Sequence, residues 1–218
     1  MARLDGSSPT RPLRMSYRHV TGKLALADGG AATYESTLER DWLLILDFDP
    51  CVTSVLVQPF TLNYALDGQT RRYTPDVKAT FDDGSTVVFE VKPRETLRSD
   101  WTLLRPRFKA AHLYCRQQGW KFRVVNEQHI RTTYLSNARF LRRFRDLPSD
   151  PVIEATLLRS LLALGETSVQ TLLVSAYWSE ENRAAAVPYL WKLVATHQIG
   201  MAPMAPLTMH SIIWSGVG

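Results

Sequence analysis

Two short segments of this chain contain the residues from which its fold can be predicted: Tyr73-Thr74-Pro75-Asp76-Val77 and Phe89-Glu90-Val91-Lys92. Between them the sequence predicts a β-hairpin, with strands over Val77–Phe81 and Thr86–Val91 and a turn over residues 82–85. Side chains alternate along a strand, so Glu90 and Lys92 share one face while Phe89 and Val91 share the other. A short hairpin returns Glu90 and Lys92 to the end where Asp76 begins. We therefore expect two carboxylates and a lysine at one rim of a sheet.

These side chains suit phosphodiester hydrolysis. Carboxylate oxygens bind hard cations such as Mg²⁺, which polarise a phosphoryl group and acidify a bound water. The lysine can orient that water or stabilise charge that develops on the phosphate. A structural interpretation is also open, in which Asp76 caps a turn while Glu90 and Lys92 form an ion pair on an edge strand.

An acidic helix is predicted upstream, over residues 34–46. Apolar residues recur at helical spacing and make one stripe, namely Leu38, Trp42, Ile45 and Leu46. Glu39 lies at the border of this stripe, where its carboxylate can lean over the sheet rim and complete a metal site. A solvated surface glutamate is the alternative, and Glu35 is an equally polar neighbour.

The segments around this helix complete a recognisable order. Asp47-Phe48-Asp49-Pro50 reads as a helix stop, Val52–Val57 as a strand, and Asp67-Gly68 as a second hairpin turn. In this order the chain resembles the PD-(D/E)xK nucleases. More narrowly, it resembles the TnsA family, the endonuclease subunit of heteromeric cut-and-paste transposases. The segments that carry the resemblance are Ser36-Thr37-Leu38-Glu39, Leu46-Asp47-Phe48-Asp49-Pro50, Gln58-Pro59, Tyr73-Thr74-Pro75-Asp76 and Glu90-Val91-Lys92-Pro93.

The resemblance implies both a fold and a site. The fold would be α/β, a restriction-endonuclease-like PD-(D/E)xK core with a small C-terminal winged-helix-like helical domain. Mg²⁺ would be the cofactor, with Mn²⁺ as a substitute, and Asp76 would bridge if two metals bind. Lys92 would be the catalytic lysine, and we expect Gln58 to be a buried polar residue that fixes its strand. The implied metal ligands are the carboxylates of Glu39, Asp76 and Glu90 and the backbone carbonyl of Val91.

Composition narrows the class of protein. The chain has 218 residues, 45% hydrophobic and 22% charged, which suits one globular domain plus a small second one. A net charge of +5 permits nucleic-acid binding without requiring it. Cys51 and Cys115 belong to no Cys/His cluster with zinc spacing, which argues against structural zinc. No secretory signal or membrane-spanning stretch is evident. We therefore expect a cytoplasmic protein that acts on bacterial DNA, with no membrane partner.

The segment after the predicted rim is basic. Pro106 suits the first turn of a helix within it. Residues 121–126 read as a strand, and residues 128–145 as a helix whose arginines face either DNA or a protein partner. The basic segment can hold scissile phosphates, or it can be a solvated helix face. Its candidate DNA-binding residues are Arg94, Arg98, Arg105, Arg107 and Lys109.

Two prolines within residues 147–151 mark the predicted domain boundary. The expected organisation is a flexible tail at residues 1–15, an endonuclease domain at 16–147 and a winged-helix-like domain at 148–218. In the last we expect three helices, the third kinked or restarting at Pro188, and strands over Ile199–Met201 and residues 207–214. The third helix offers Arg183 and Lys192 and little else that is basic. We therefore favour protein docking or weak backbone contacts over sequence-specific DNA readout.

The resemblance further implies a reaction and partners. The protein would cleave the 5′ strands at transposon ends during cut-and-paste transposition. Its partners would be double-stranded DNA, a DDE transposase (TnsB-like) that cuts the 3′ strands, and an AAA+ regulator (TnsC-like). Two alternatives stay open: a free-standing PD-(D/E)xK restriction or repair nuclease, and a non-catalytic DNA-binding or scaffold subunit.

Overall fold

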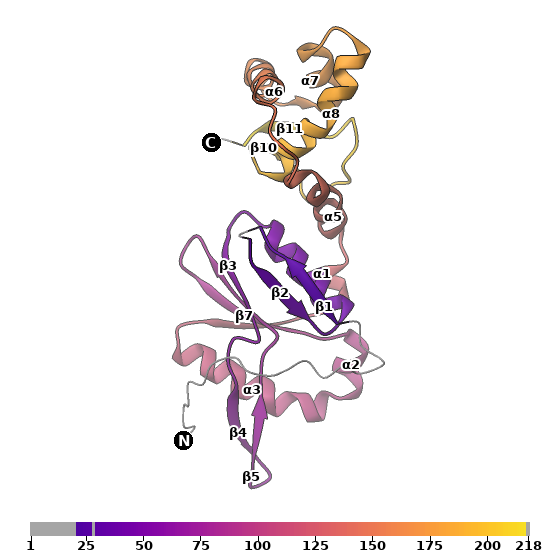
Figure 1. Ribbon diagram of the computed structural model, residues 1–218. Coiled ribbons are helices and arrows are strands. Elements are labelled where there is room, and N and C mark those ends of the chain that lie inside the picture. Colours follow the sequence, from indigo (N-terminus) through magenta and orange to yellow (C-terminus); the bar gives the residue numbers. More distant parts are fainter. Residues whose placement is uncertain (1–20, 28, 217–218) are drawn as a thin grey trace. The chain divides into compact units, whose positions relative to one another are not determined.

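The computed structural model describes residues 21–27 and 29–216, which form two compact units that divide between Ile130 and Arg131 (Figure 1). The expected tail at residues 1–15 lies outside the described residues. The division precedes the expected boundary at residues 147–151, because helix α5 (Thr133–Arg145) packs within the second unit. The α5 residue Phe140 meets Trp191 edge-on, with ring centroids 5.4 Å apart. Asn137 Nδ2 also donates hydrogen bonds to the carbonyls of Pro203 and Ala205.

A four-stranded sheet is the centre of the first unit. Its strands run in the order β3 (Val52–Val57), β6 (Val77–Phe81), β7 (Thr86–Val91) and β8 (Lys121–Val125). The first three are antiparallel, and β8 pairs with β7 in parallel. The predicted hairpin is confirmed, and Gly84 in its turn has φ +77°, a conformation that glycine adopts without steric cost.

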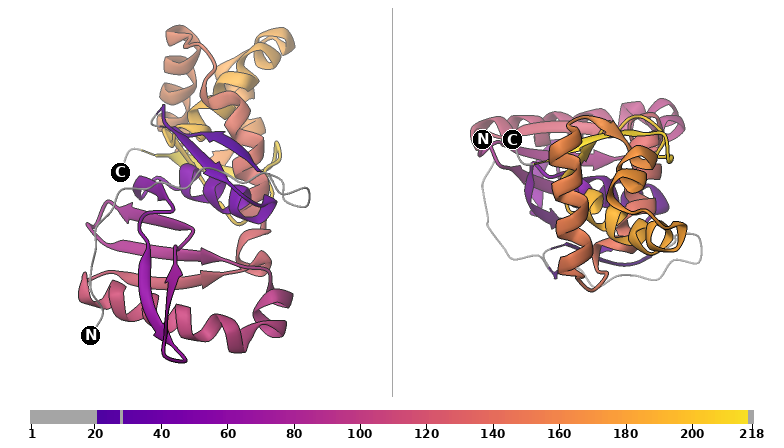
Figure 2. Two further views of the ribbon diagram at one scale, coloured as in Figure 1. Left: turned by 60° about the horizontal axis from the view of Figure 1, so that its bottom comes forward. Right: turned by 90° about the horizontal axis from the view of Figure 1, so that it is seen from above.

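Two helices cover opposite faces of this sheet (Figure 2). On one face, Trp42 of α1 (Thr37–Phe48) packs edge-on against Phe89, with ring centroids 4.9 Å apart. On the other face, α3 (Trp101–Gln117) contributes to a core cluster against which Val124 of β8 packs. Glu90 is the register partner of Val124. Glu90 therefore faces α3 while its neighbour Phe89 faces α1, as strand alternation predicts.

The start of α1 differs from the sequence prediction of a helix over residues 34–46. Tyr34 belongs to a hairpin of β1 (Gly22–Ala25) and β2 (Ala31–Tyr34), where it pairs with Gly22. The helix begins at Thr37, because the Ser36 side chain accepts a hydrogen bond from the Glu39 N–H and caps it. It ends at Phe48, within the predicted stop.

The second predicted hairpin is also present. Strands β4 (Leu62–Leu66) and β5 (Gln69–Tyr73) form a two-stranded antiparallel sheet. This ribbon, residues 62–73, projects from the first unit (Figure 1). At its base Leu62 and Tyr73 join the core cluster beneath α3.

Two further helix predictions need correction. Pro106 lies inside α3 and not in its first turn, because the helix begins at Trp101 and follows the short helix α2 (Arg94–Ser99). Proline has no N–H, so Pro106 cannot donate to the carbonyl four residues earlier. The single helix predicted over residues 128–145 is divided into α4 (Glu127–Ile130) and α5, because Thr132 adopts extended backbone with φ −107° and ψ 176°.

The second unit combines four helices with a small antiparallel sheet in the order β10-β11-β9. Its α8 helix continues through Pro188, so it does not restart there. The second predicted strand is shorter than residues 207–214, because the preceding loop is bound to Asn137. After α5, the elements are α6 (Pro151–Leu164), β9 (Thr167–Ser168), α7 (Val169–Ala176), α8 (Glu180–Ala195), β10 (Ile199–Met201) and β11 (Ile212–Ser215).

Candidate active site

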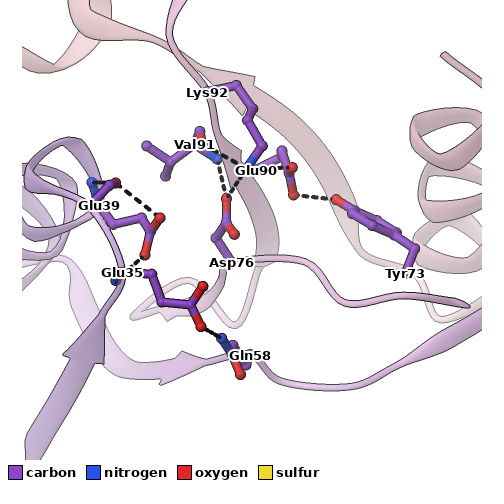
Figure 3. Close-up of polar contacts among 9 residues, drawn as sticks. Glu35, Glu39, Gln58, Tyr73, Asp76, Glu90, Val91 and Lys92 are labelled. Carbon is purple, nitrogen blue, oxygen red and sulfur yellow. Dashed lines mark hydrogen bonds and ion pairs between the residues drawn. The ribbon is translucent and has the colours of Figure 1, made fainter. Parts of the chain in front are cut away.

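Asp76 and Glu90 meet at one edge of the four-stranded sheet. Val77 pairs with Phe89, so the residue before β6 lies beside the last residues of β7. The Val91 N–H donates a 2.7 Å hydrogen bond to Asp76 Oδ2 and fixes that carboxylate in place. In Figure 3 the side chains of Asp76, Glu90 and Lys92 lie between Glu39 on one side and Tyr73 on the other. The predicted convergence of two carboxylates and a lysine is confirmed.

Glu90 is a buried carboxylate with two fixed partners. Only 1% of its surface is exposed. The Tyr73 O–H donates to Glu90 Oε2, and Lys92 Nζ lies 3.0 Å from Oε1. Burial and the negative charge of Glu90 raise the pKa of Tyr73, so its hydroxyl stays protonated and able to donate. Each oxygen of the Glu90 carboxylate therefore has its own partner, and these two contacts fix the orientation of the carboxylate.

Lys92 places its ammonium between the two carboxylates. Its Nζ lies 3.5 Å from Asp76 Oδ2 and donates to the Val91 carbonyl at 3.2 Å. Burial lowers the pKa of Lys92, but Asp76 and Glu90 outweigh that effect and leave it raised. Lys92 is thus positively charged at neutral pH.

The Asp76 carboxyl has a raised pKa, about 7. Burial is the largest cause, followed by the negative charge of Glu90. Lys92 and the Val91 N–H lower this pKa, and Glu39 raises it further. The single ammonium therefore leaves negative charge at this edge incompletely compensated. Further positive charge here would favour the ionised form of Asp76.

Glu39 lies near this edge, but its carboxylate is engaged at the start of α1. Its Oε2 accepts from the Glu35 N–H at 2.8 Å, and its Oε1 accepts from Ser36 Oγ at 3.0 Å. With the Ser36 cap, these contacts resemble a capping box, except that Glu39 accepts from the N–H of Glu35 and not from that of the N-cap residue Ser36. Within residues 21–27 and 29–216, no group of three or more His, Cys, Asp or Glu side chains is gathered as a metal-binding set. Glu39 is thus held by contacts at the start of α1, and its charge raises the pKa of Asp76.

Gln58 connects the segment before α1 to the site through its backbone and side chain. It has φ 46°, and its N–H donates to the Asp76 carbonyl at 2.8 Å. Its Nε2 donates to Glu35 Oε1 at 3.0 Å. Gln58 is half-buried and not buried as expected. Its contacts hold the end of β3, and they occupy Glu35 rather than Glu39.

The five candidate DNA-binding residues do not share one surface. Arg94, Arg98, Arg105 and Lys109 are exposed. Arg107 is about 200° around the helix from Arg105, and its guanidinium lies 5.6 Å from the centroid of the Tyr73 ring. Arg107 Nε is buried without a hydrogen-bond partner in the described part of the chain. Arg107 thus belongs to the shell around Tyr73 and not to the exposed basic face of α3.

Tyr73 belongs to the candidate site through its contact with Glu90, and the sequence prediction did not include it. It stands in the quoted segment Tyr73-Thr74-Pro75-Asp76, but its role comes from a contact with Glu90, far away along the chain. A bulky residue with one hydroxyl, three positions before Asp76 at the end of a predicted strand, was the available signal.

Residues 49–127 match the family model described as TnsA-like endonuclease N terminal. The matched range contains Gln58, Asp76, Glu90 and Lys92, whereas Glu39 precedes it. The mixed α/β architecture with a multi-stranded sheet fits such a nuclease domain. A search of curated proteins finds no match. In the part of the chain that the structure describes, every helix is too short or too polar to cross a membrane.

Proposed function

We propose that this protein, whose residues 49–127 form a TnsA-like endonuclease N-terminal domain, is a metal-dependent DNA endonuclease of cut-and-paste transposition. It cleaves the 5′ strands at transposon ends, while a DDE transposase (TnsB-like) cuts the 3′ strands. The observation that carries the proposal is the placement of Asp76, Glu90 and Lys92 at one sheet edge inside the matched range. For the mixed α/β first unit we propose the fold of a PD-(D/E)xK nuclease core.

The donor chemistry of this edge fits a hard divalent cation. Two carboxylates converge on positive charge, since Lys92 Nζ lies 3.0 Å from one and 3.5 Å from the other. We propose that Asp76, Glu90 and the Val91 carbonyl hold Mg²⁺, or Mn²⁺ in its place, with Glu39 as an additional ligand once it leaves its capping contacts. The bound cation would polarise the phosphoryl group and acidify a water molecule.

The protein's own groups would orient the reaction. The Val91 N–H holds Asp76 Oδ2, and the Tyr73 O–H holds Glu90 Oε2, so both carboxylates are oriented in advance. Protonated Lys92 can donate to the attacking water or to a phosphate oxygen on which charge develops. The exposed residues Arg94, Arg98, Arg105 and Lys109 would bind neighbouring phosphates.

The second unit has the element order of a winged helix: helix, strand, two helices and two strands from α6 to β11. We propose this fold for it, with protein contact as its role. Arg183 Nη1 donates to the carbonyls of Tyr177 and Trp178, and Lys192 Nζ lies 2.8 Å from Glu154 Oε1. The two basic side chains of α8 are therefore engaged within the unit, which disfavours DNA readout by this helix.

The proposed partners follow from the roles of the two units, which are strand cleavage for the first and protein contact for the second. Transposon-end DNA would be recognised by the transposase, and an AAA+ regulator (TnsC-like) would be a further protein partner. The isolated protein is then expected to cleave DNA weakly or not at all. Strong sequence-specific cleavage by the protein alone would instead favour a free-standing nuclease.

The test is cleavage of a plasmid-borne transposon by this protein, the neighbouring transposase and Mg²⁺, with cuts mapped on each strand. Lys92→Ala should lower 5′-strand cleavage by about 100-fold or more while 3′ cuts persist. Chelation with EDTA should stop 5′ cleavage, and Mg²⁺ or Mn²⁺ should restore it. Unchanged cutting of both strands by Lys92→Ala would favour the scaffold alternative.

A further inference from the structure

The β4–β5 ribbon rises from the same sheet edge that carries Asp76, Glu90 and Lys92. Val57 at the end of β3 pairs with Val77 at the start of β6, and the chain between these two residues contains the ribbon. Tyr73, the last residue of β5, donates its O–H to Glu90. The two carboxylates therefore lie beside the base of the ribbon.

The register of the ribbon gives it two different faces. Directly opposed residues of antiparallel strands lie on the same face. One face carries the pairs Leu62–Tyr73 and Tyr64–Arg71, and its base packs in the core cluster with α3. The opposite face, here called the outer face, carries the pairs Asn63–Arg72 and Ala65–Thr70.

The outer face is exposed at all four positions. Within the described part of the chain, the side chains of Asn63, Thr70 and Arg72 make no hydrogen bond or ion pair. Arg72 brings positive charge, and the one acidic residue of the ribbon is Asp67 in the turn. The outer face thus carries one positive charge, at Arg72, beside two polar side chains, and these three side chains are unpaired within the described residues.

The chemistry of this face matches DNA. Arginine binds phosphates and forms paired hydrogen bonds with guanine, and asparagine forms them with adenine. Asn63 and Arg72 are directly opposed, so both side chains reach the same place. Ala65 and Thr70 are small and allow close approach of the backbone. A two-stranded ribbon fits the major groove, and a five-residue strand of about 17 Å is longer than the groove is wide, about 12 Å.

We infer that the outer face of the ribbon binds double-stranded DNA beside the scissile phosphate, with Arg72 and Asn63 as the contacting side chains. The location of that phosphate rests on the proposed endonuclease function. The ribbon contact itself is a binding property of the first unit that does not require metal.

Arg71 and Arg72 form a matched pair for the test. They are neighbours on β5 and both exposed, so each substitution to Gln removes one charge at nearly the same place. They differ in face, because successive side chains of a strand alternate. The probe is a fluorescein-labelled duplex of about three helical turns. Its affinity for the full chain is measured by anisotropy against NaCl concentration, in EDTA so that cleavage does not interfere.

Arg72→Gln should weaken duplex binding by about 5–10-fold and lower the slope of log affinity against log salt by about 1. Arg71→Gln should leave both quantities within about twofold of the wild type. Asn63→Ala should weaken binding while keeping the wild-type salt slope, because asparagine is neutral. Thermal unfolding should be unchanged in all three variants, since the side chains are exposed.

Equal losses from the two arginine variants would overturn the inference, as would no duplex binding by the wild type. Unchanged duplex binding by Arg72→Gln, with weaker assembly with the transposase, would assign the face to protein and overturn it as well. The binding difference is measured without metal. A difference in duplex binding between Arg72→Gln and Arg71→Gln would therefore support the inference even if the protein cleaved no strand. Absence of cleavage would count against the nuclease proposal alone.

Discussion

At the residue scale, the Asp76 carboxyl is held at a pKa of about 7 by burial and by Glu90. In an unfolded chain the pKa of aspartate is about 3.9, so the folded state binds the proton more tightly. The free energy of unfolding should therefore fall as pH rises from about 4 to about 7. We expect the metal-free protein to lose about 2 kcal/mol over this range through Asp76, less than the full linkage because the group is partly exposed.

Asp76→Asn removes this titration while keeping an oxygen that accepts from the Val91 N–H. In urea unfolding with EDTA, the variant should be more stable than the wild type at pH 8 and nearly equal to it at pH 4. An identical pH dependence in both proteins would show that Asp76 is not the group responsible.

Tyr73 should matter for the site through one hydrogen bond. Tyr73→Phe removes the hydroxyl that donates to Glu90 Oε2 and leaves that buried oxygen without this donor, which should cost about 1–3 kcal/mol of stability. Cleavage should also fall, because Glu90 loses its orientation. Tyr64→Phe is the matched control, since Tyr64 packs against the same core cluster. Its loss of stability and of cleavage should be clearly smaller than that of Tyr73→Phe.

Among the secondary-structure elements, helix α1 offers two variants, at Glu39 and Ser36, that distinguish a capping role of Glu39 from a metal-binding role. Glu39→Gln removes the charge but keeps one side-chain oxygen that can accept from the Glu35 N–H, and its Nε2 can donate to Ser36 Oγ in place of the bond that Glu39 accepts. We expect unchanged thermal stability and a large loss of metal-dependent cleavage. Ser36→Ala should do the reverse, costing about 1 kcal/mol of stability with cleavage retained. Full activity of Glu39→Gln would leave Glu39 with the capping role alone.

Elements with strong local signals were predictable. The β6–β7 hairpin follows from β-branched residues around the Asp-Gly turn at Gly84, and the caps of α6 to α8 follow from polar residues before apolar runs. The start of α1 was missed because Tyr34 pairs with Gly22 in a hairpin that no local signal marks clearly. The contacts of Glu39 with Glu35 and Ser36 do have a local signal, since Ser-x-x-Glu is typical of a helix start, but a helix predicted from residue 34 places Ser36 inside it and not at its cap.

For the molecule as a whole, the sequence did not reveal that α5 packs with the second unit and not with the first. Its partners, Trp191 and the loop at residues 203–207, lie far along the chain, while the prolines at residues 148 and 151 gave the stronger local signal. The residues that meet at the candidate site were predictable, because a hairpin fixes which residues lie opposite one another. The role of Tyr73 was not, because it depends on how the ribbon packs on the sheet.

The assignment of α5 can be tested with fragments. A fragment of residues 131–218 should unfold cooperatively, because it keeps the Phe140–Trp191 contact and the Asn137 bonds. A fragment of residues 148–218 should unfold at a clearly lower temperature or bind a dye for exposed apolar surface, since Trp191 and the loop lose these partners. Equal melting temperatures by circular dichroism would return the boundary to residues 147–151.

The position of Lys92 gives the protein an internal counterion. Its ammonium lies where the carboxylates of Asp76 and Glu90 converge, so Lys92 balances part of their charge without a bound cation. The two carboxylates are then partly neutralised by a side chain of the protein itself. If Mg²⁺ binds here as we propose, it must compete with Lys92 for the same oxygens. A lysine that has been displaced toward solvent and substrate is free to meet a phosphate. Under this proposal, binding of the metal and release of Lys92 toward the phosphate would occur in the same step.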